Sequence, residues 1–222
     1  MGFSFAKEKS LSQKNTAIEV LMTSKISMVF VSVLIILGLL AGCVVVSAMD
    51  APAMAARFGL YSQTDPESHT ALAHEIVDFL CGRTDALPSF QSHEVQHMRD
   101  VKNIFTVLFL VMFLGLVGLV NLIFQRKLGS MKVFLQTLLG AAAVIAAFVI
   151  WGLIDFDSLF YVFHLVAFRN DLWLLDPAKD LLIQLMPTPF FMDYARTILA
   201  AFGCGLVILA GGAYLLKRRY QR

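Results

Sequence analysis

The chain has 222 residues, of which 58% are hydrophobic and 15% are charged, and its formal net charge is +2. Four long runs contain no Asp, Glu, Lys or Arg, which excludes an ordinary soluble fold, because a core helix in a soluble domain is usually shorter and keeps a polar face. The small net charge gives no indication of nucleic-acid binding.

The four uncharged runs are residues 26–49, 103–125, 133–154 and 197–216. As a helix rising about 1.5 Å per residue, each can cross about 30 Å of hydrocarbon. We therefore predict an all-α, polytopic membrane protein in which residues 1–222 form a single membrane domain. Four transmembrane helices alternate with two outer segments, 49–102 and 155–196, that contain short interfacial helices.

The first run could instead be a cleaved signal, because residues 39–43 (Leu-Leu-Ala-Gly-Cys) have the form of a lipobox. Apolar residues continue beyond Cys43 through Val46, however, and we therefore interpret the run as a membrane anchor.

Basic residues predict the orientation, since short loops rich in Lys and Arg stay in the cytoplasm. They gather without acids in the loop after the second run and in the tail: Arg126, Lys127 and Lys132, then Lys217, Arg218, Arg219 and Arg222. The two outer segments are acidic by comparison and hold every histidine of the chain. We expect both termini in the cytoplasm and the histidines on the extracytoplasmic face.

In the first outer segment, Asp65, Pro66 and Glu67 predict a helix start and Gly82 predicts its end. An apolar stripe along this helix suits a position on the bilayer surface or over the spans. His69 and His74 lie on it, and we interpret both as ordinary surface residues.

A second helix is predicted from about Ser92 into the second span, because no Gly or Pro interrupts it. His93, His97 and Asp100 then share one face, and the ring of His97 lies at the depth of lipid headgroups and esters. Residues 93–97 also match H-E-x-x-H, in which two histidines bind zinc and the Glu activates a water. A membrane zinc metallopeptidase is therefore an alternative, with His164 or Asp176 as a third ligand.

The second outer segment opens with an aromatic stretch, residues 156–168, in which Tyr161, His164 and Phe168 share a helix face. Aromatic residues at this depth usually form the interfacial belt. His164 differs from them, because its ring is costly to bury unpaired and titrates near neutral pH. Asp176 and Pro177 predict the start of another short helix.

These motifs occur together in a recognisable order. The pattern comprises Phe90, Ser92, Glu94, His97, Met98, Asp100, Val101 and Lys102, then Phe163, His164 and Phe168, then Trp173, Asp176, Asp180, Leu182, Ile183, Pro187, Phe190, Phe191 and Asp193. It resembles the bacterial lipoprotein intramolecular transacylase (Lit) family from about the first span to the fourth. Residues 1–24 lie outside the resemblance and His93 is not part of its pattern, which makes the zinc motif look accidental.

The resemblance implies transfer of the sn-2 acyl chain of a diacylglyceryl-modified lipoprotein to the α-amino group of its own N-terminal Cys, which gives a lyso-lipoprotein. His97 and His164 would be the functional histidines. The expected partners are such lipoproteins and membrane lipids, in a multi-pass cell-membrane enzyme without metal or cofactor. A non-catalytic membrane scaffold would be favoured if no histidine mattered.

The chemistry needs a base for an amine with a pKa of about 8, and a histidine with a pKa of about 6.5 is suitable. We assign this role to His97, with Glu94 or Asp100 as an orienting carboxylate, and oxyanion stabilisation or proton donation to His164. The reverse assignment and an acyl-histidine intermediate stay open. Ser92, Tyr161 and Trp173 are further supporting candidates. Alanine at position 97 or 164 should abolish activity, whereas His69→Ala and His93→Ala should not.

Overall fold

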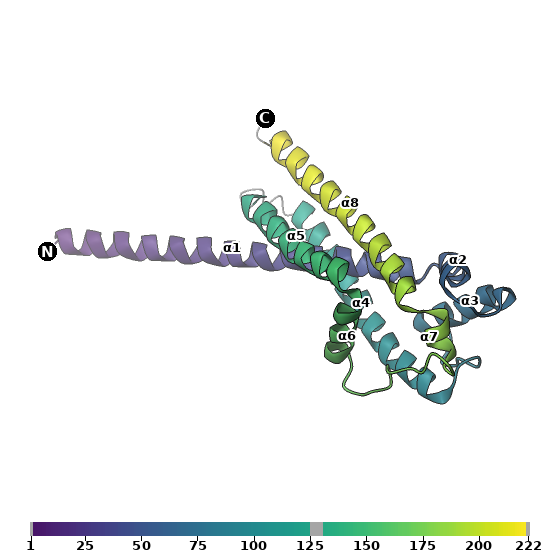
Figure 1. Ribbon diagram of the computed structural model, residues 1–222. Coiled ribbons are helices and arrows are strands. Elements are labelled where there is room, and N and C mark those ends of the chain that lie inside the picture. Colours follow the sequence, from purple (N-terminus) through teal and green to yellow (C-terminus); the bar gives the residue numbers. More distant parts are fainter. Residues whose placement is uncertain (1, 125–130, 221–222) are drawn as a thin grey trace.

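The computed structural model describes residues 2–124 and 131–220, and all regular structure within them is helical (Figure 1). Arg126, Lys127 and Arg222, which contribute to the orientation argument, lie outside the described residues.

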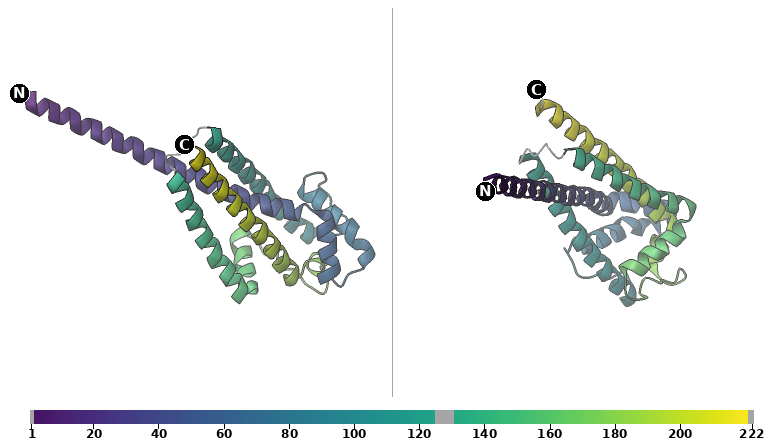
Figure 2. Two further views of the ribbon diagram at one scale, coloured as in Figure 1. Left: turned by 90° about the horizontal axis from the view of Figure 1, so that it is seen from above. Right: turned by 90° about the vertical axis from the view of Figure 1, so that its left-hand side faces the viewer.

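Four helices of the described chain are long and apolar enough to cross a membrane, as the sequence predicts. They are α1 (Gly2–Ala48), α4 (Ser92–Phe124), α5 (Met131–Ile154) and α8 (Thr188–Tyr220). Helix α1 packs against the other three, and its N-terminal part extends beyond them (Figures 1 and 2). It continues without a break past Cys43, which agrees with the anchor interpretation.

Two of the long helices begin well before their predicted spans. Helix α4 starts at Ser92, as the sequence predicts, because no proline or glycine interrupts the polar turns before the span. Helix α8 starts at Thr188, with Pro189 in its first turn, where a missing backbone N–H costs nothing. The polar turns of residues 92–102 are thus part of one continuous helix with the second span, which gives His97 a rigid support.

Helices α1 and α4 cross at two glycines. A Cβ atom built on Gly38 would lie 2.7 Å from the Cα atom of Gly115, closer than real Cβ atoms approach. Small residues allow transmembrane helix backbones to approach in this way. The crossing fixes α4 against the membrane anchor.

The shorter helices lie at one end of the bundle and are called the cap here (Figure 1). They are α2 (Ala51–Tyr61), a 3₁₀ turn (Pro66–Ser68), α3 (His69–Leu80), α6 (Phe156–Ala167) and α7 (Leu181–Leu185). The apolar stripe of α3 is buried in a cluster with Phe58, Leu185 and Phe190. This stripe therefore covers protein, which decides between the two positions that its sequence allows.

The start and end of the predicted helix in the first outer segment are confirmed. Asp65 accepts a hydrogen bond from the N–H of Glu67 at the start of the 3₁₀ turn, and α3 follows directly. Gly82 adopts a positive φ of 74° just beyond the helix end, a conformation that glycine adopts without steric cost.

Two expectations for the outer segments are wrong. His69 is buried rather than on the surface, because its Nε2 pairs with the hydroxyl of Thr64 over 2.9 Å and its ring packs against Phe58. No helix starts at Asp176 and Pro177. The Asp176 carboxylate accepts the N–H of Ala178 in a turn, and α7 begins only at Leu181.

Candidate active site

The structure brings together two histidines from different outer segments. His97 lies in the second turn of α4, and His164 lies near the end of α6, whose first turn is capped by the carboxylate of Asp155. Their ring centroids are 6.4 Å apart and the ring planes are inclined by 29°. Both side chains are buried, with relative exposures of 6% and 8%. Two titratable rings held face to face in an apolar setting are a candidate acid–base site.

His164 is fixed by its own helix. Its Nδ1 donates to the carbonyl oxygen of Phe160, one turn earlier, over 2.7 Å. Since a carbonyl can only accept, the neutral ring carries its lone pair on Nε2. Burial lowers the pKa of His164 below its ordinary value, and the bond to Phe160 opposes this shift. His164 is therefore a neutral base near pH 7, with one defined nitrogen able to take a proton.

His97 has a different environment. Its Nδ1 is buried without a hydrogen-bond partner in the described structure, and the edge of its ring packs against Phe168 with centroids 4.9 Å apart. The predicted orienting carboxylate does not bond to it. Glu94 instead accepts the backbone N–H groups of Gln91 and Leu182, and Asp100 accepts the side-chain amide of Asn170.

Aromatic side chains surround the histidine pair. The ring centroid of His164 lies 5.0 Å from that of Trp173 and 4.2 Å from that of Phe160. Tyr161 packs edge-on against Trp173. Tyr161 is half exposed, with a relative exposure of 51%. Ser92, the remaining supporting candidate, is an exposed residue at the start of α4. Phe160 had no predicted role, although its i–4 spacing from His164 was a usable signal.

The geometry does not support the zinc alternative. Glu94 has a relative exposure of 0% and its carboxylate oxygens are bound to backbone amides, so it is not available to activate a water. His93 is paired through Nε2 with Asp180 over 3.0 Å. No group of three or more His, Cys, Asp or Glu side chains within the described ranges is arranged to hold a metal.

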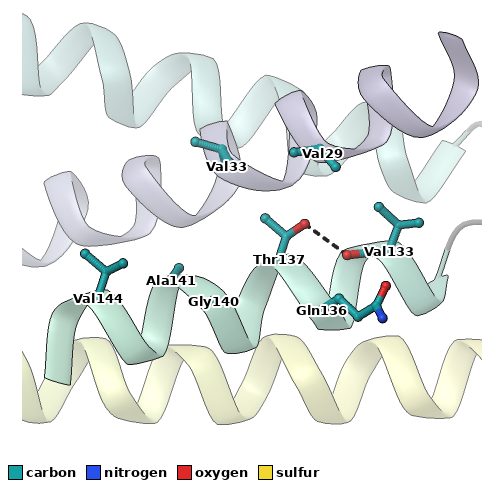
Figure 3. Close-up of a pocket in the computed structure, with 8 residues that line it drawn as sticks. All are labelled: Val29, Val33, Val133, Gln136, Thr137, Gly140, Ala141 and Val144. Atoms are coloured by element: carbon teal, nitrogen blue, oxygen red, sulfur yellow. Dashed lines mark hydrogen bonds between the residues drawn. The ribbon is translucent and has the colours of Figure 1, made fainter. Parts of the chain in front are cut away.

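A cavity of about 460 Å³ opens between α1 and α5 (Figure 3), and no histidine is among the residues that line it. It is lined mostly by valine and small residues, and the hydroxyl of Thr137 there is satisfied by the carbonyl oxygen of Val133. The lining residues that α5 supplies lie between positions 133 and 144, whereas α6 and His164 follow the end of α5 at Ile154. No lining residue is titratable, so this cavity is not a second acid–base site.

Comparison with known proteins now bears on the histidine pair. The family model described as lipoprotein intramolecular transacylase Lit matches residues 26–191, which include His97, His164 and all of the aromatic contacts described above. The chain belongs to the Lit family. It is therefore an acyltransferase that is integral to the membrane and acts in bacterial lipoprotein modification.

Solved structures of Lit from Bacillus cereus have the same fold. One is 20% identical over 90% of this chain and 95% of that chain, with a TM-score of 0.66. A variant with a histidine replaced by alanine gives a TM-score of 0.70 at 18% identity, over 92% of this chain and 99% of that chain. No curated protein matches this chain.

Proposed function

We propose that this Lit family member moves the sn-2 acyl chain of a diacylglyceryl-modified lipoprotein to the α-amino group of the same N-terminal Cys, through His97 and His164. The observation that carries the proposal is the facing of the two buried rings, with centroids 6.4 Å apart. The product is an N-acylated lipoprotein that keeps a monoacylglyceryl group on the Cys sulfur. Because both reacting groups belong to one substrate, alignment supplies an effective molarity of about 10⁵ M or more.

The hydrogen bond of His164 supports a role for this ring as the base. The amine nitrogen attacks the ester carbonyl carbon, and its proton passes to Nε2 of His164, the nitrogen that does not bond to Phe160. The carbon–oxygen bond to glycerol then breaks, and His164 returns the same proton to the glycerol oxygen. The ring ends neutral, so protons balance without a second base. This reverses the assignment made from sequence, in which His97 was the base.

His97 suits the second task, stabilisation of the oxyanion. A buried N–H without an acceptor is rare, so the unpartnered Nδ1 of His97 favours the form with the hydrogen on Nε2. That N–H can donate to the ester oxygen as negative charge develops on it. The aromatic side chains of Trp173 and Phe168 would exclude water around both rings.

We further propose that both termini face the cytoplasm and that the site lies on the extracytoplasmic face. The bias of Lys and Arg toward the α4–α5 connection and the tail supports this orientation. The helices of the cap lie at the opposite end of the bundle from the last turns of α4 and the first turns of α5 (Figures 1 and 2). Tyr161, half exposed on α6, suits contact with lipid at the membrane interface.

The test is conversion of diacylglyceryl to lyso-lipoprotein in membranes, followed by mass spectrometry of the released lipopeptides. Alanine at position 97 or at position 164 should stop the conversion in protein that is still folded and inserted. Full activity in either variant would overturn the proposal.

A further inference from the structure

The loop that follows His164 has no helix of its own until α7, yet it supplies two of the rings around the site. Phe168 contacts His97 and Trp173 contacts His164. Residues 168–180 contain only turns, bends and extended chain. Ring packing and side-chain hydrogen bonds to the rest of the protein hold these residues in place.

Four side-chain hydrogen bonds join this loop and the start of α7 to the first turns of α4, the helix of His97. They pair Gln91 with the carbonyl oxygen of Lys179, His93 with Asp180, Glu94 with the N–H of Leu182, and Asp100 with Asn170. The distances run from 2.6 to 3.0 Å. Three of the four come from residues 91–94, at the start of α4 and directly before it, and they hold residues 179, 180 and 182.

Glu94 is central to this attachment. One carboxylate oxygen accepts the N–H of Leu182 over 2.6 Å, and the other accepts the N–H of Gln91 over 2.8 Å. It thereby satisfies a free N–H at the start of α4 and another at the start of α7. The side chain has a relative exposure of 0%, so water cannot replace either bond.

We infer that Glu94 is a positioning residue for acyl transfer, one that sets the second outer segment against the helix of His97, with the His93–Asp180 pair as its partner. Neither Glu94 nor His93 touches the reacting atoms. The inference rests on the proposed function of the histidine pair. It gives the Glu94 carboxylate a structural role in place of the water activation that the zinc motif implies. A carboxylate is required because a neutral amide in the same place can accept on only one side.

The first test is Glu94→Gln in the full-length enzyme, assayed in detergent with a synthetic dipalmitoylglyceryl-cysteinyl peptide. We expect kcat to fall about tenfold to 100-fold with KM changed less than about twofold, because misplacement of a supporting element costs turnover rather than binding. Hydrogen exchange measured by mass spectrometry should become faster in the peptide that contains Leu182.

Glu75→Gln is the matched control. Glu75 also accepts a backbone N–H, that of Ser89, but both residues belong to the first outer segment. It should keep the kcat of the wild type. Equal losses in the two variants, or a normal kcat in Glu94→Gln, would overturn the inference.

The His93 position gives a second route if Glu94→Gln does not fold. His93→Gln keeps a side-chain N–H that can donate to Asp180, whereas His93→Ala removes it. We expect kcat to fall about threefold to tenfold in His93→Ala and to recover in His93→Gln. No difference between the two would count against positioning, and inactivity of both would favour direct catalysis by His93. An active His97→Ala would instead overturn the proposed function, whatever the result at Glu94 and His93.

Discussion

The rings of His97 and His164 face each other with centroids 6.4 Å apart, although one belongs to α4 and the other to α6. They are chemically unequal. Nδ1 of His164 is bonded to the carbonyl oxygen of Phe160, whereas Nδ1 of His97 is buried without a partner in the described structure. Substitutions at the two positions should therefore fail in different ways.

Loss of either ring should remove most of the activity. We expect His97→Ala and His164→Ala each to lower turnover at least about 100-fold, the usual contribution of a positioned acid, base or donor. Mass spectrometry of lipopeptides gives the readout. His74→Ala is the matched control, because His74 is exposed on α3, whereas His69 is buried and bonded to Thr64. A loss below tenfold at position 97 or 164 would contradict the assignment.

Amide substitutions should separate the two roles. His97→Gln retains an N–H donor near the position of Nε2 and should be about tenfold more active than His97→Ala. His164→Asn retains a donor to Phe160 but cannot exchange a proton. The His164→Asn variant should be as inactive as His164→Ala, but its melting temperature should be close to that of the wild type. Activity in His164→Asn together with inactivity in His97→Gln would favour the reverse assignment.

The rate should respond to pH through two groups. Burial lowers the pKa of His164 below 6.5, so the neutral base persists as the pH falls to that value. The α-amino group of the substrate has a pKa of about 8 and must be neutral to attack. We expect kcat/KM to decline below about pH 8 because of the amine and to steepen only below pH 6.5. A steepening at pH 7 or above would show that burial does not act on His164 as described.

The same shift predicts the pH dependence of stability. A histidine whose pKa is lower in the folded state takes up its proton more readily when unfolded. Its neutral form therefore favours the folded state above about pH 6.5, and this advantage is lost as the pH falls through that value. When the pH is lowered from 7.5 to 5.5, the melting temperature of the wild type should fall more than the melting temperature of His164→Asn. Equal falls would contradict the prediction.

The crossing of α1 and α4 should tolerate no methyl group. Gly38→Ala places a Cβ atom 2.7 Å from the Cα atom of Gly115 and should destabilise the protein by about 1–3 kcal/mol. Gly211→Ala is the control, because a Cβ atom there meets nothing within 4 Å and alanine favours helix by about 1 kcal/mol. The melting temperature, measured in one detergent, should therefore fall for Gly38→Ala and rise for Gly211→Ala.

Orientation can be tested with single cysteines in a background that lacks the three native ones. A cysteine in place of His74 should react with an impermeant maleimide in intact cells. A cysteine in place of Arg218 should react only after the membrane is permeabilised. Both residues are exposed, so protection reports the membrane rather than burial. The reverse pattern would place the histidine pair in the cytoplasm.

The sequence by itself determined the number of spans and the helix that carries His97. Uncharged runs of about 20 residues leave a helix few alternatives in a bilayer, and the stretch after Ser92 has no residue that breaks a helix. The helix start at Asp65 and the helix end at Gly82 could also be predicted, because each depends on residues next to it in the sequence. Family resemblance then indicated His97 and His164, which periodicity alone could not select among the histidines.

Only the tertiary structure decided which partners those residues have. Glu94 lies next to the histidines in sequence, but its carboxylate is bonded to Leu182, far along the chain, because buried N–H groups at two helix starts require an acceptor. His69 was likewise predicted as a surface residue from its position on one helix, but it is buried against Phe58 of another helix. Spacing along one helix fixes which way a side chain points, whereas its partner comes from another segment, whose position depends on how the whole chain packs.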